Sequence, residues 1–174
     1  MPDLRPPTPD DAGAWFDFLI AQQAIAYAGI VPDDFAERQQ AQRAAWLKGL
    51  ERKFSVPGTA RRLVAESDGR LVGVASVVDG PADWEVSLGY VPSPAPRELS
   101  RLYVAPEFHG TGLAAELFDR LDDGADLYLW LIDGNERAHR FYRRRGLVDL
   151  AENFQAGDSW GNVGMHRMVR ITNG

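Results

Sequence analysis

A short bend with two glycines separates an apolar stretch from an amphipathic one. Gly110 and Gly112 follow the apolar residues 102–104, and leucines then recur at helical spacing over residues 113–121. Glycine lets a backbone approach a ligand closely, and the first turn of a helix presents N–H groups that have no intrahelical partner. Together with the helix dipole, these groups favour an anion such as phosphate. The bend therefore predicts a phosphate site, although a tight strand-to-helix connection without a ligand has the same pattern.

The bend matches neither of two common nucleotide motifs. No Lys-Ser/Thr pair follows its glycines, so it is not a Walker motif, and the third glycine of the dinucleotide fingerprint is missing. Adenylate-type phosphoryl transfer therefore loses its main support.

A second informative stretch covers residues 135–146. Asn135, Ala138 or His139, and Tyr142 recur at steps of three and four residues, so on a helix they share one face. Gly146 can end this helix in a left-handed conformation. The pattern places an amide and a phenol beside one site, but it also fits an amphipathic helix whose tyrosine lies at the edge of the core.

Periodicity predicts the elements that position these two stretches. We expect a mixed sheet with helices packed on it, in a single α/β domain over residues 1–174. The turn Asp68-Gly69 between two β-type runs indicates a hairpin. The expected helices cover residues 33–52, 112–122 and 135–145, with a first helix through Trp15 and Ile20 that Asp10 or Asp11 could cap. The expected strands cover residues 63–66, 71–78, 98–104, 127–132, 147–153 and 163–171, and residues 80–96 form a long loop.

Composition excludes several classes of protein. The 174 residues carry 19 basic and 25 acidic side chains, a formal charge of −6, which argues against nonspecific nucleic-acid binding. Cysteine is absent, which excludes a disulfide framework, a thiolate metal site and a cysteine nucleophile. The three histidines lack metal-type spacing, so we expect no metal. We see neither a signal peptide nor a membrane span, and we expect a cytoplasmic location.

The two stretches, in this order and each after a predicted strand, resemble the GNAT superfamily of acyl-CoA-dependent N-acetyltransferases. The family's pyrophosphate loop, Gln/Arg-x-x-Gly-x-Gly/Ala, is matched in its last positions by His109-Gly-Thr-Gly-Leu-Ala114. Its second motif, Asn-x-x-Ala-x-x-Phe-Tyr-x-x-x-Gly, is matched in full by residues 135–146. One departure is His109, which stands where the family usually has Gln or Arg.

The resemblance implies a mostly antiparallel sheet in which one parallel pair of strands splays, with helices on both faces. By position the splayed strands are residues 98–104 and 127–132, and the pantetheine arm of acetyl-CoA enters between them. The implied coenzyme-binding residues are Leu102, Tyr103, Val104, His109, Gly110, Thr111, Gly112, Leu113, Ala114, Asn135, Ala138 and Tyr142. A main-chain N–H at this strand would stabilise the negative charge that develops on the thioester oxygen.

The resemblance also implies roles for two side chains. An acceptor amine is mostly protonated at neutral pH and must lose a proton before it attacks. Glu98 is the candidate general base, directly or through a water, because strand alternation places it on one face with Ser100, Leu102 and Val104. Tyr142 is the candidate general acid for the departing thiolate, and the absence of cysteine favours direct transfer in a ternary complex.

The acceptor is a small-molecule or peptide amine of unspecified identity. In the family, the first two helices and the loop after the third strand shape its pocket. In this sequence those segments supply Tyr27, Asp33, Asp34, Trp84 and Tyr90, whose aromatic rings and carboxylates could hold an ammonium group. A homodimer is also compatible with the resemblance.

Two competing readings remain. The stretch Gly157-Asp-Ser159-Trp-Gly161 matches a hydrolase nucleophile elbow, but a β-turn between the last two strands explains it better. A non-catalytic sensor that binds acyl-CoA would carry the same glycine bend. Only a catalyst requires the pair Glu98 and Tyr142.

Overall fold

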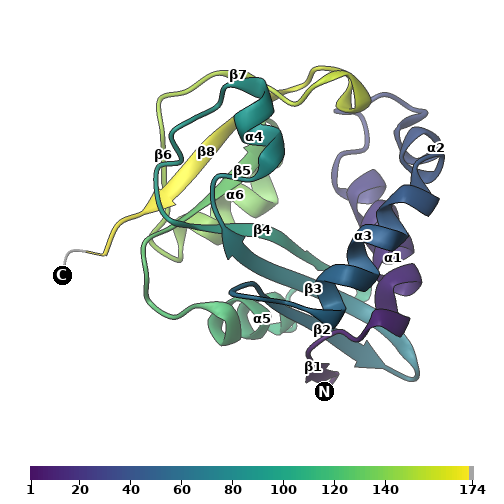
Figure 1. The fold of residues 1–174 in the computed structure, drawn as a ribbon. Helices are drawn as coiled ribbons and strands as arrows, with labels where there is room; N and C mark the ends of the chain where they lie inside the picture. Colours follow the sequence, from purple (N-terminus) through teal and green to yellow (C-terminus); the bar gives the residue numbers. More distant parts are fainter. Residues whose placement is uncertain (173–174) are drawn as a thin grey trace.

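Eight strands form one sheet in the order β1-β2-β3-β4-β5-β8-β6, with β7 paired to β8. The computed structural model in Figure 1 describes residues 1–172, so the last two residues of the domain predicted over residues 1–174 lie outside the described part. Every pairing is antiparallel except that of β4 with β5. The predicted mixed, mostly antiparallel sheet is therefore confirmed. The strands are β1 (Asp3–Arg5), β2 (Arg61–Ser67), β3 (Arg70–Asp79), β4 (Arg97–Val104), β5 (Leu127–Ile132), β6 (Val148–Asp149), β7 (Phe154–Gln155) and β8 (Gly164–Arg170).

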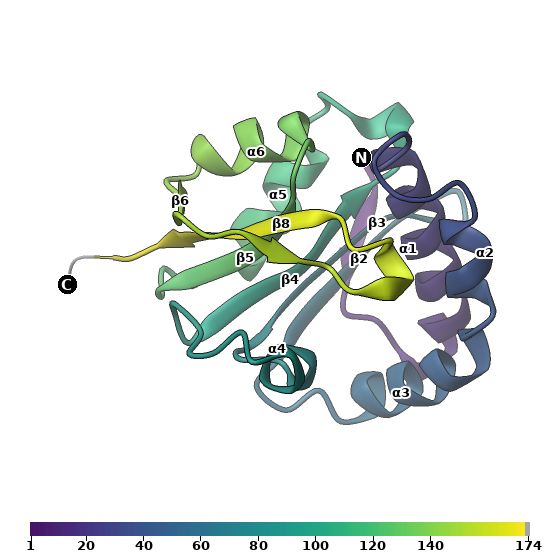
Figure 2. The ribbon, with the colours of Figure 1, turned by 90° about the horizontal axis from the view of Figure 1, so that it is seen from above.

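Helices cover both faces of this sheet, as predicted. Seen from above, α5 and α6 lie on one side of the strands, whereas α1, α3 and α4 lie on the other (Figure 2). The first side contains the largest apolar cluster, built on Leu117, Phe118 and Leu129. The second contains a cluster around Trp15, Phe16 and Val74. The helices are α1 (Ala12–Ala26), α2 (Phe35–Gln40), α3 (Arg43–Ser55), α4 (Asp83–Leu88), α5 (Leu113–Leu121) and α6 (Glu136–Arg143).

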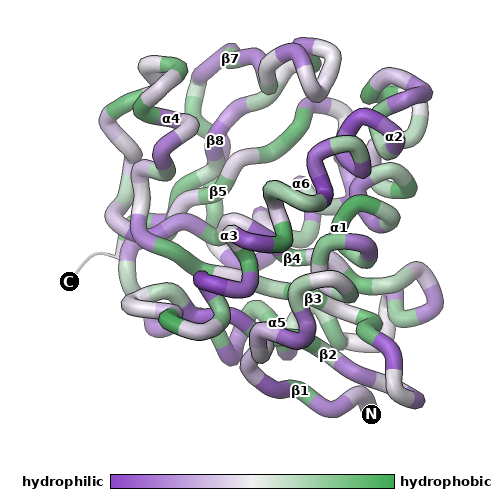
Figure 3. Tube along the Cα trace, turned by 45° about the vertical axis from the view of Figure 1, so that its right-hand side comes forward, coloured by the Kyte–Doolittle hydropathy of each residue, from purple (hydrophilic) through white to green (hydrophobic). Residues whose placement is uncertain are grey.

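The hydropathy of the chain follows this layering. In Figure 3 the hydrophobic colour runs along β5 and much of α1, whereas α2 is largely hydrophilic. Burial of the β5 side chains on both faces explains why residues 127–132 read as one continuous apolar run. Within residues 1–172, no helix combines the length and the apolar character needed to cross a lipid bilayer.

The parallel pair β4–β5 is joined at only one end. Arg97 pairs with Leu127 and Glu98 pairs with Tyr128, and no further register is formed between the two strands in the described chain. Beyond these pairs β4 continues to pair with β3, and β5 continues to pair with β8. The facing edges of β4 and β5 therefore diverge and leave backbone groups available between them, as the resemblance implied.

A β-bulge changes which side chains of β4 share a face. Leu99 pairs with Val77 and Arg101 pairs with Ser76, so Ser100 is an extra residue in β4. As a result Leu99, Leu102 and Val104 all pack on the α5–α6 side. The prediction that Glu98 shares a face with Leu102 and Val104 is wrong, because the bulge shifts the alternation between them.

Several predicted boundaries also differ from the structure. The helix expected over residues 33–52 is two helices, α2 and α3, with a turn at residues 41 and 42. The strand expected over residues 147–153 is reduced to β6, and a separate short strand, β7, follows it. Asp11 does not cap α1 through its side chain, because its carboxylate accepts the Thr8 N–H at 2.6 Å and the Arg5 guanidinium at 2.7 Å.

The predicted loop over residues 80–96 contains α4. Its anchor is Glu85, which is completely buried and accepts hydrogen bonds from the Ala82 N–H at 2.6 Å, the Tyr128 hydroxyl at 2.8 Å and the Trp130 indole at 3.0 Å. Two of these donors belong to β5, more than forty residues away in sequence. A six-residue helix held by such distant partners has no periodicity that the sequence could reveal.

Candidate active site

A cavity of about 380 Å³ opens where β4 and β5 diverge. Its walls are residues 99–104 of β4, the bend before α5, the C-terminal part of α1, and α6 with the arginines that follow it. The described lining includes four arginines and no aspartate or glutamate, although the whole chain has a formal charge of −6. These arginines are Arg101, Arg137, Arg144 and Arg145. A cavity of this sign is suited to a ligand with several negative charges.

The bend between β4 and α5 has the geometry of an anion site. Gly110 and Gly112 have φ values of 79° and 93°, which favour glycine because it lacks a Cβ. Within residues 1–172, no hydrogen-bond acceptor is found for the N–H groups of Gly110, Gly112, Ala114 and Ala115. Thr111 closes the turn by donating its hydroxyl to the Phe108 carbonyl at 2.8 Å. The free N–H groups and the start of α5 thus lie together beside the cavity.

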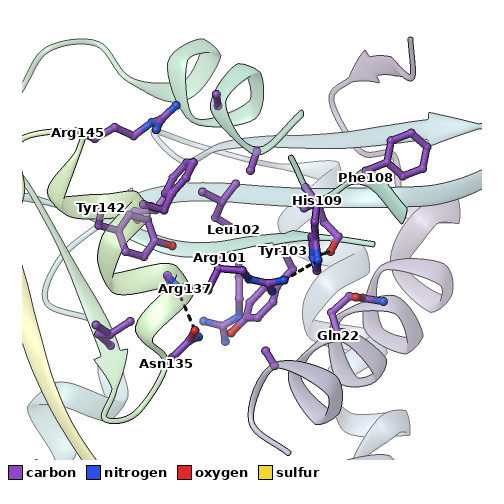
Figure 4. A pocket seen from close by; sticks show the side chains of 18 of the residues that line it. Gln22, Arg101, Leu102, Tyr103, Phe108, His109, Asn135, Arg137, Tyr142 and Arg145 are labelled. Atoms are coloured by element: carbon purple, nitrogen blue, oxygen red, sulfur yellow. Dashed lines mark hydrogen bonds between the residues drawn. The ribbon is translucent and has the colours of Figure 1, made fainter. Parts of the chain in front are cut away.

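His109 supports the bend through both ring nitrogens. The Arg137 guanidinium can only donate, so Nδ1 of His109 accepts its hydrogen bond. The ring proton is then on Nε2, which donates to the Val104 carbonyl at 3.2 Å. In this arrangement the imidazole ties β4 to α6 and holds the Arg137 guanidinium beside the bend (Figure 4).

Some motif residues of α6 stabilise the ends of the helix, and some line the cavity. The side chain of Asn135 accepts the Ala138 N–H at 3.2 Å and caps the helix, and both residues line the cavity. Gly146, with φ of 80°, follows the helix as predicted. The Tyr142 ring is buried against the core, and its hydroxyl points toward the cavity (Figure 4). Burial, with a smaller contribution from Tyr103, raises the pKa of Tyr142 well above its usual value, so the phenol keeps its proton at neutral pH.

Glu98 lies on the opposite face of β4 from Leu102. It is 4% exposed, its Oε2 has no hydrogen-bond partner in the described chain, and its side chain does not line the cavity. Burial raises its pKa to about 7, against the attraction of Arg101 and with a further contribution from the nearby Glu85. A carboxyl group with this pKa exchanges protons near neutrality, which is the property required of a general base.

The residues suggested for the acceptor are not all brought together. Tyr27 lines the cavity, and its hydroxyl lies 2.9 Å from that of Tyr103. Trp84 and Tyr90 pack on Trp130, with ring centroids 5.1 and 5.8 Å from it, and Trp130 in turn lines the cavity. Asp33 and Asp34 do not line it: both are exposed, and Asp34 pairs with Arg38 at 2.8 Å.

The aromatic group formed by Trp84, Tyr90 and Trp130 already packs against a cation of the chain. The Arg167 guanidinium lies 5.2 Å from the centre of the Trp130 ring and is paired with Glu152. This leaves less reason to expect an ammonium ligand over these rings, because Arg167 already lies beside one of them.

Sequence reasoning missed the arginines of the cavity and Trp130. The run Arg143-Arg144-Arg145 in an acidic chain was a visible signal, and two of its members line the cavity. Arg101 was hidden because the bulge at Ser100 cannot be recognised from strand alternation. Trp130 was interpreted only as part of an apolar strand, although it lines the cavity.

The hydrolase interpretation does not fit the structure. Residues 158–160 form a single 3-10 turn between β7 and β8 rather than a strand–turn–helix elbow. His166 is bonded to Asp133 at 2.7 Å and to Asp149 at 3.1 Å, not to Ser159. Within residues 1–172, no group of three or more histidine, cysteine or acidic side chains is arranged to hold a metal ion.

Comparison with known proteins finds a family profile and curated relatives that match this chain. Residues 27–147 match the profile described as "Acetyltransferase (GNAT) family". Curated relatives in Mycobacterium tuberculosis and Mycobacterium bovis, each called an uncharacterised N-acetyltransferase, are 39% identical over 102 residues. The match covers 55% of this chain and 58% of each relative, so the chain spans less than two thirds of their length.

Solved structures share the architecture. The PaiA N-acetyltransferase of Thermoplasma acidophilum, crystallised with coenzyme A, superposes with a TM-score of 0.71 at 16% identity, covering 96% of this chain and 98% of that chain. An acetyltransferase from Thermus thermophilus gives a TM-score of 0.63 at 19% identity, with 97% and 95% coverage. At these identities the likeness establishes the fold.

Proposed function

Because the chain belongs to the acetyltransferase (GNAT) family, we propose that it transfers the acetyl group of acetyl-CoA to an amine acceptor, directly in a complex of protein, acetyl-CoA and acceptor. The observation that supports this most is the cavity between the diverging ends of β4 and β5, with its four arginines and its free N–H groups. An extended chain with negatively charged groups at one end fits such a space. Coenzyme A has this form.

The residues present fit the coenzyme. The N–H groups of Gly110, Gly112 and Ala114 would bind its diphosphate, and the guanidinium of Arg137 would add a positive charge at the same end. The exposed edge of β4 at Leu102–Val104 would pair with the amides of the pantetheine arm, as one strand pairs with another. Asn135 and Ala138 would line the opposite wall.

The chemistry requires two proton transfers by this chain. Acetyl-CoA supplies the acetyl thioester; a carbon–nitrogen bond forms as the carbon–sulfur bond breaks. Glu98 takes the first proton that the ammonium group loses, through a water, since its buried carboxyl group does not line the cavity. Tyr142 gives its phenolic proton to the departing sulfur, and the second proton that the nitrogen loses as the amide forms restores the phenol. A backbone N–H beside the bulge at Ser100 stabilises the charge on the thioester oxygen.

On the acceptor side, we propose that the amine approaches from the face of β4 that carries Arg101 and Tyr103. Tyr27 and Trp130 form the walls there, and Trp84 and Tyr90 lie behind Trp130. Asp33 and Asp34 are left out of this pocket because of their position at the surface.

Two measurements test the proposal. Acetyl-CoA is expected to raise the melting temperature of the protein, and a panel of primary amines is expected to release free thiol from acetyl-CoA. A melting temperature that does not respond to saturating acetyl-CoA contradicts the binding site. Binding without thiol release by any class of amine favours the acyl-CoA sensor instead.

A further inference from the structure

Arg101 is a charged side chain of the cavity that coenzyme binding does not explain. It lies midway along β4, three residues before the strand ends, whereas the bend that would hold the diphosphate follows that end. Its guanidinium makes one hydrogen bond, to the carbonyl of the neighbouring Ser100. Within residues 1–172 it has no ion pair with a carboxylate. Because a guanidinium carries five N–H donors, most of its hydrogen-bonding capacity is available to a ligand.

The surroundings of Arg101 place it on the acceptor side. By strand alternation it shares its face with Tyr103, which packs toward α1, and its charge acts on both Tyr27 and Glu98. Figure 4 shows the side chain in the middle of the cavity, between Tyr103 and Asn135. Glu98 and Arg101 flank the bulged Ser100 on this same face. A base and an unpaired cation therefore stand on either side of the point where the thioester is proposed to lie.

We propose that Arg101 binds a carboxylate of the acceptor, so that the amine acetylated by this protein belongs to an α-amino acid. The inference rests on the proposed function and names its substrate class. A planar guanidinium binds a carboxylate through two parallel hydrogen bonds, which also orients the attached amine. Across the bulge Glu98 pairs with Val78 and Arg101 with Ser76, two residues apart on β3, so the two are about 7 Å apart along the sheet, and both side chains are long enough to converge on a small molecule. The same charge disfavours polyamines and other polycations.

The test compares three acceptors that share a side chain: phenylalanine, phenylalaninamide and phenethylamine. The wild-type protein is expected to acetylate the amino acid with a kcat/KM at least about tenfold higher than either analogue, a ratio typical of one charge-assisted hydrogen-bond pair. In Arg101→Gln this preference is expected to fall to about one. Arg101→Lys keeps the charge but not the paired donors, so it should retain part of the preference. Comparing ratios between variants cancels the different basicities of the three amines.

Arg137→Gln is the matched control. It removes another arginine from the same cavity, at the end next to His109. This variant is expected to weaken acetyl-CoA binding, measured by calorimetry, and to keep the preference for the amino acid. Arg101→Gln is expected to show the reverse pattern.

The results separate the inference from the proposed function. A wild-type preference for phenylalaninamide or phenethylamine, or a preference for phenylalanine that persists in Arg101→Gln, overturns the role of Arg101 while acetyl transfer stands. Loss of acetyl-CoA binding in Arg101→Gln to the extent seen in Arg137→Gln also overturns it. Absence of thiol release with these three acceptors, when another amine of the panel does release thiol, overturns the inference alone. Absence of thiol release with every amine of the panel overturns both proposals.

Discussion

At the scale of single residues, Glu98 has the property on which the proposed chemistry depends most. Its carboxyl group is buried without a partner for one oxygen, and its pKa is raised to about 7. The ionised form, which can accept a proton, therefore predominates only above neutral pH. We expect kcat/KM to rise as the pH increases through about 7.

Glu98→Gln removes this proton acceptor with little change in volume. We expect kcat/KM for thiol release to fall by about 10²–10⁴-fold and the inflection near pH 7 to disappear. A variant that keeps the inflection would assign it to another group.

Stability gives an independent readout of the same group. The folded pKa of Glu98 exceeds the unfolded value of about 4.3, so between these two values the folded state binds more protons. The free energy of unfolding of the wild-type protein should therefore decrease as the pH rises through this window, by up to about 4 kcal/mol. Glu98→Gln should lose that decrease, whether or not the carboxyl group takes part in catalysis. The comparison, by denaturant titration at several pH values, tests the raised pKa itself.

A further prediction at the scale of single residues concerns Tyr142. Its raised pKa keeps the phenol protonated over the working range, so it remains able to donate to the departing sulfur. We expect Tyr142→Phe to lower kcat by about 10–10²-fold, less than a complete loss because solvent can also supply the proton. The affinity for acetyl-CoA, measured by calorimetry, should change far less than kcat. Equal turnover in the variant would remove Tyr142 from the mechanism.

Which residues could be predicted depended on whether local sequence or tertiary structure fixes their position. Gly110, Asn135 and Tyr142 were predicted because turn geometry and helical spacing place them. Arg101 was missed and Glu98 was put on the wrong face for one reason: a single extra residue at Ser100 reverses strand alternation.

At the scale of elements, substitutions in the bend before α5 can distinguish an effect on acetyl-CoA binding from an effect on stability. Gly110 and Gly124 have φ values of 79° and 77°, and at both positions an added Cβ would meet open space. Gly110→Ala and Gly124→Ala should therefore destabilise the fold by a similar amount, about 1–2 kcal/mol. Gly110 lines the cavity, whereas Gly124 lies in the turn before β5, outside the lining.

Only Gly110→Ala should weaken acetyl-CoA binding, by about tenfold, because only there do strain and an added methyl disturb the N–H groups of the bend. Thermal denaturation with and without acetyl-CoA measures both effects. Equal responses of the two variants to acetyl-CoA would mean that the bend does not hold the coenzyme.

The elements themselves show the limits of sequence pattern. The strand over residues 127–132 and the turn at Asp68-Gly69 were predicted correctly, since an apolar run and two positive φ angles are local features. Helix α4 was missed because the hydrogen bonds that hold Glu85 come from β5. The break between α2 and α3 has no glycine or proline to mark it, so the expected single helix was too long.

At the scale of the whole molecule, the side chains that line the cavity differ in the sign of their charge from the chain as a whole. The chain has a formal charge of −6, yet four arginines and no acidic side chain are found in the described lining of the cavity. The net negative charge of the chain repels a polyanion at long range, and the arginines of the cavity attract it at short range. Binding of a coenzyme with several phosphate charges should therefore respond to ionic strength, because salt screens exposed charges over about 10 Å at 0.1 M.

We expect the Kd of acetyl-CoA to rise by about tenfold when the salt concentration is raised from about 0.05 to 0.5 M. S-acetyl-pantetheine has the same thioester and arm but no phosphate, so its weaker binding should change by less than about twofold over that range. Isothermal calorimetry with both compounds measures the difference. If both respond equally to salt, the arginines do not face the phosphates, and the coenzyme lies in the cavity in another orientation or outside it. A larger salt response of acetyl-CoA than of S-acetyl-pantetheine indicates that the phosphates bind at the basic wall formed by α6 and the bend. The uncharged arm then binds between the divergent edges of β4 and β5.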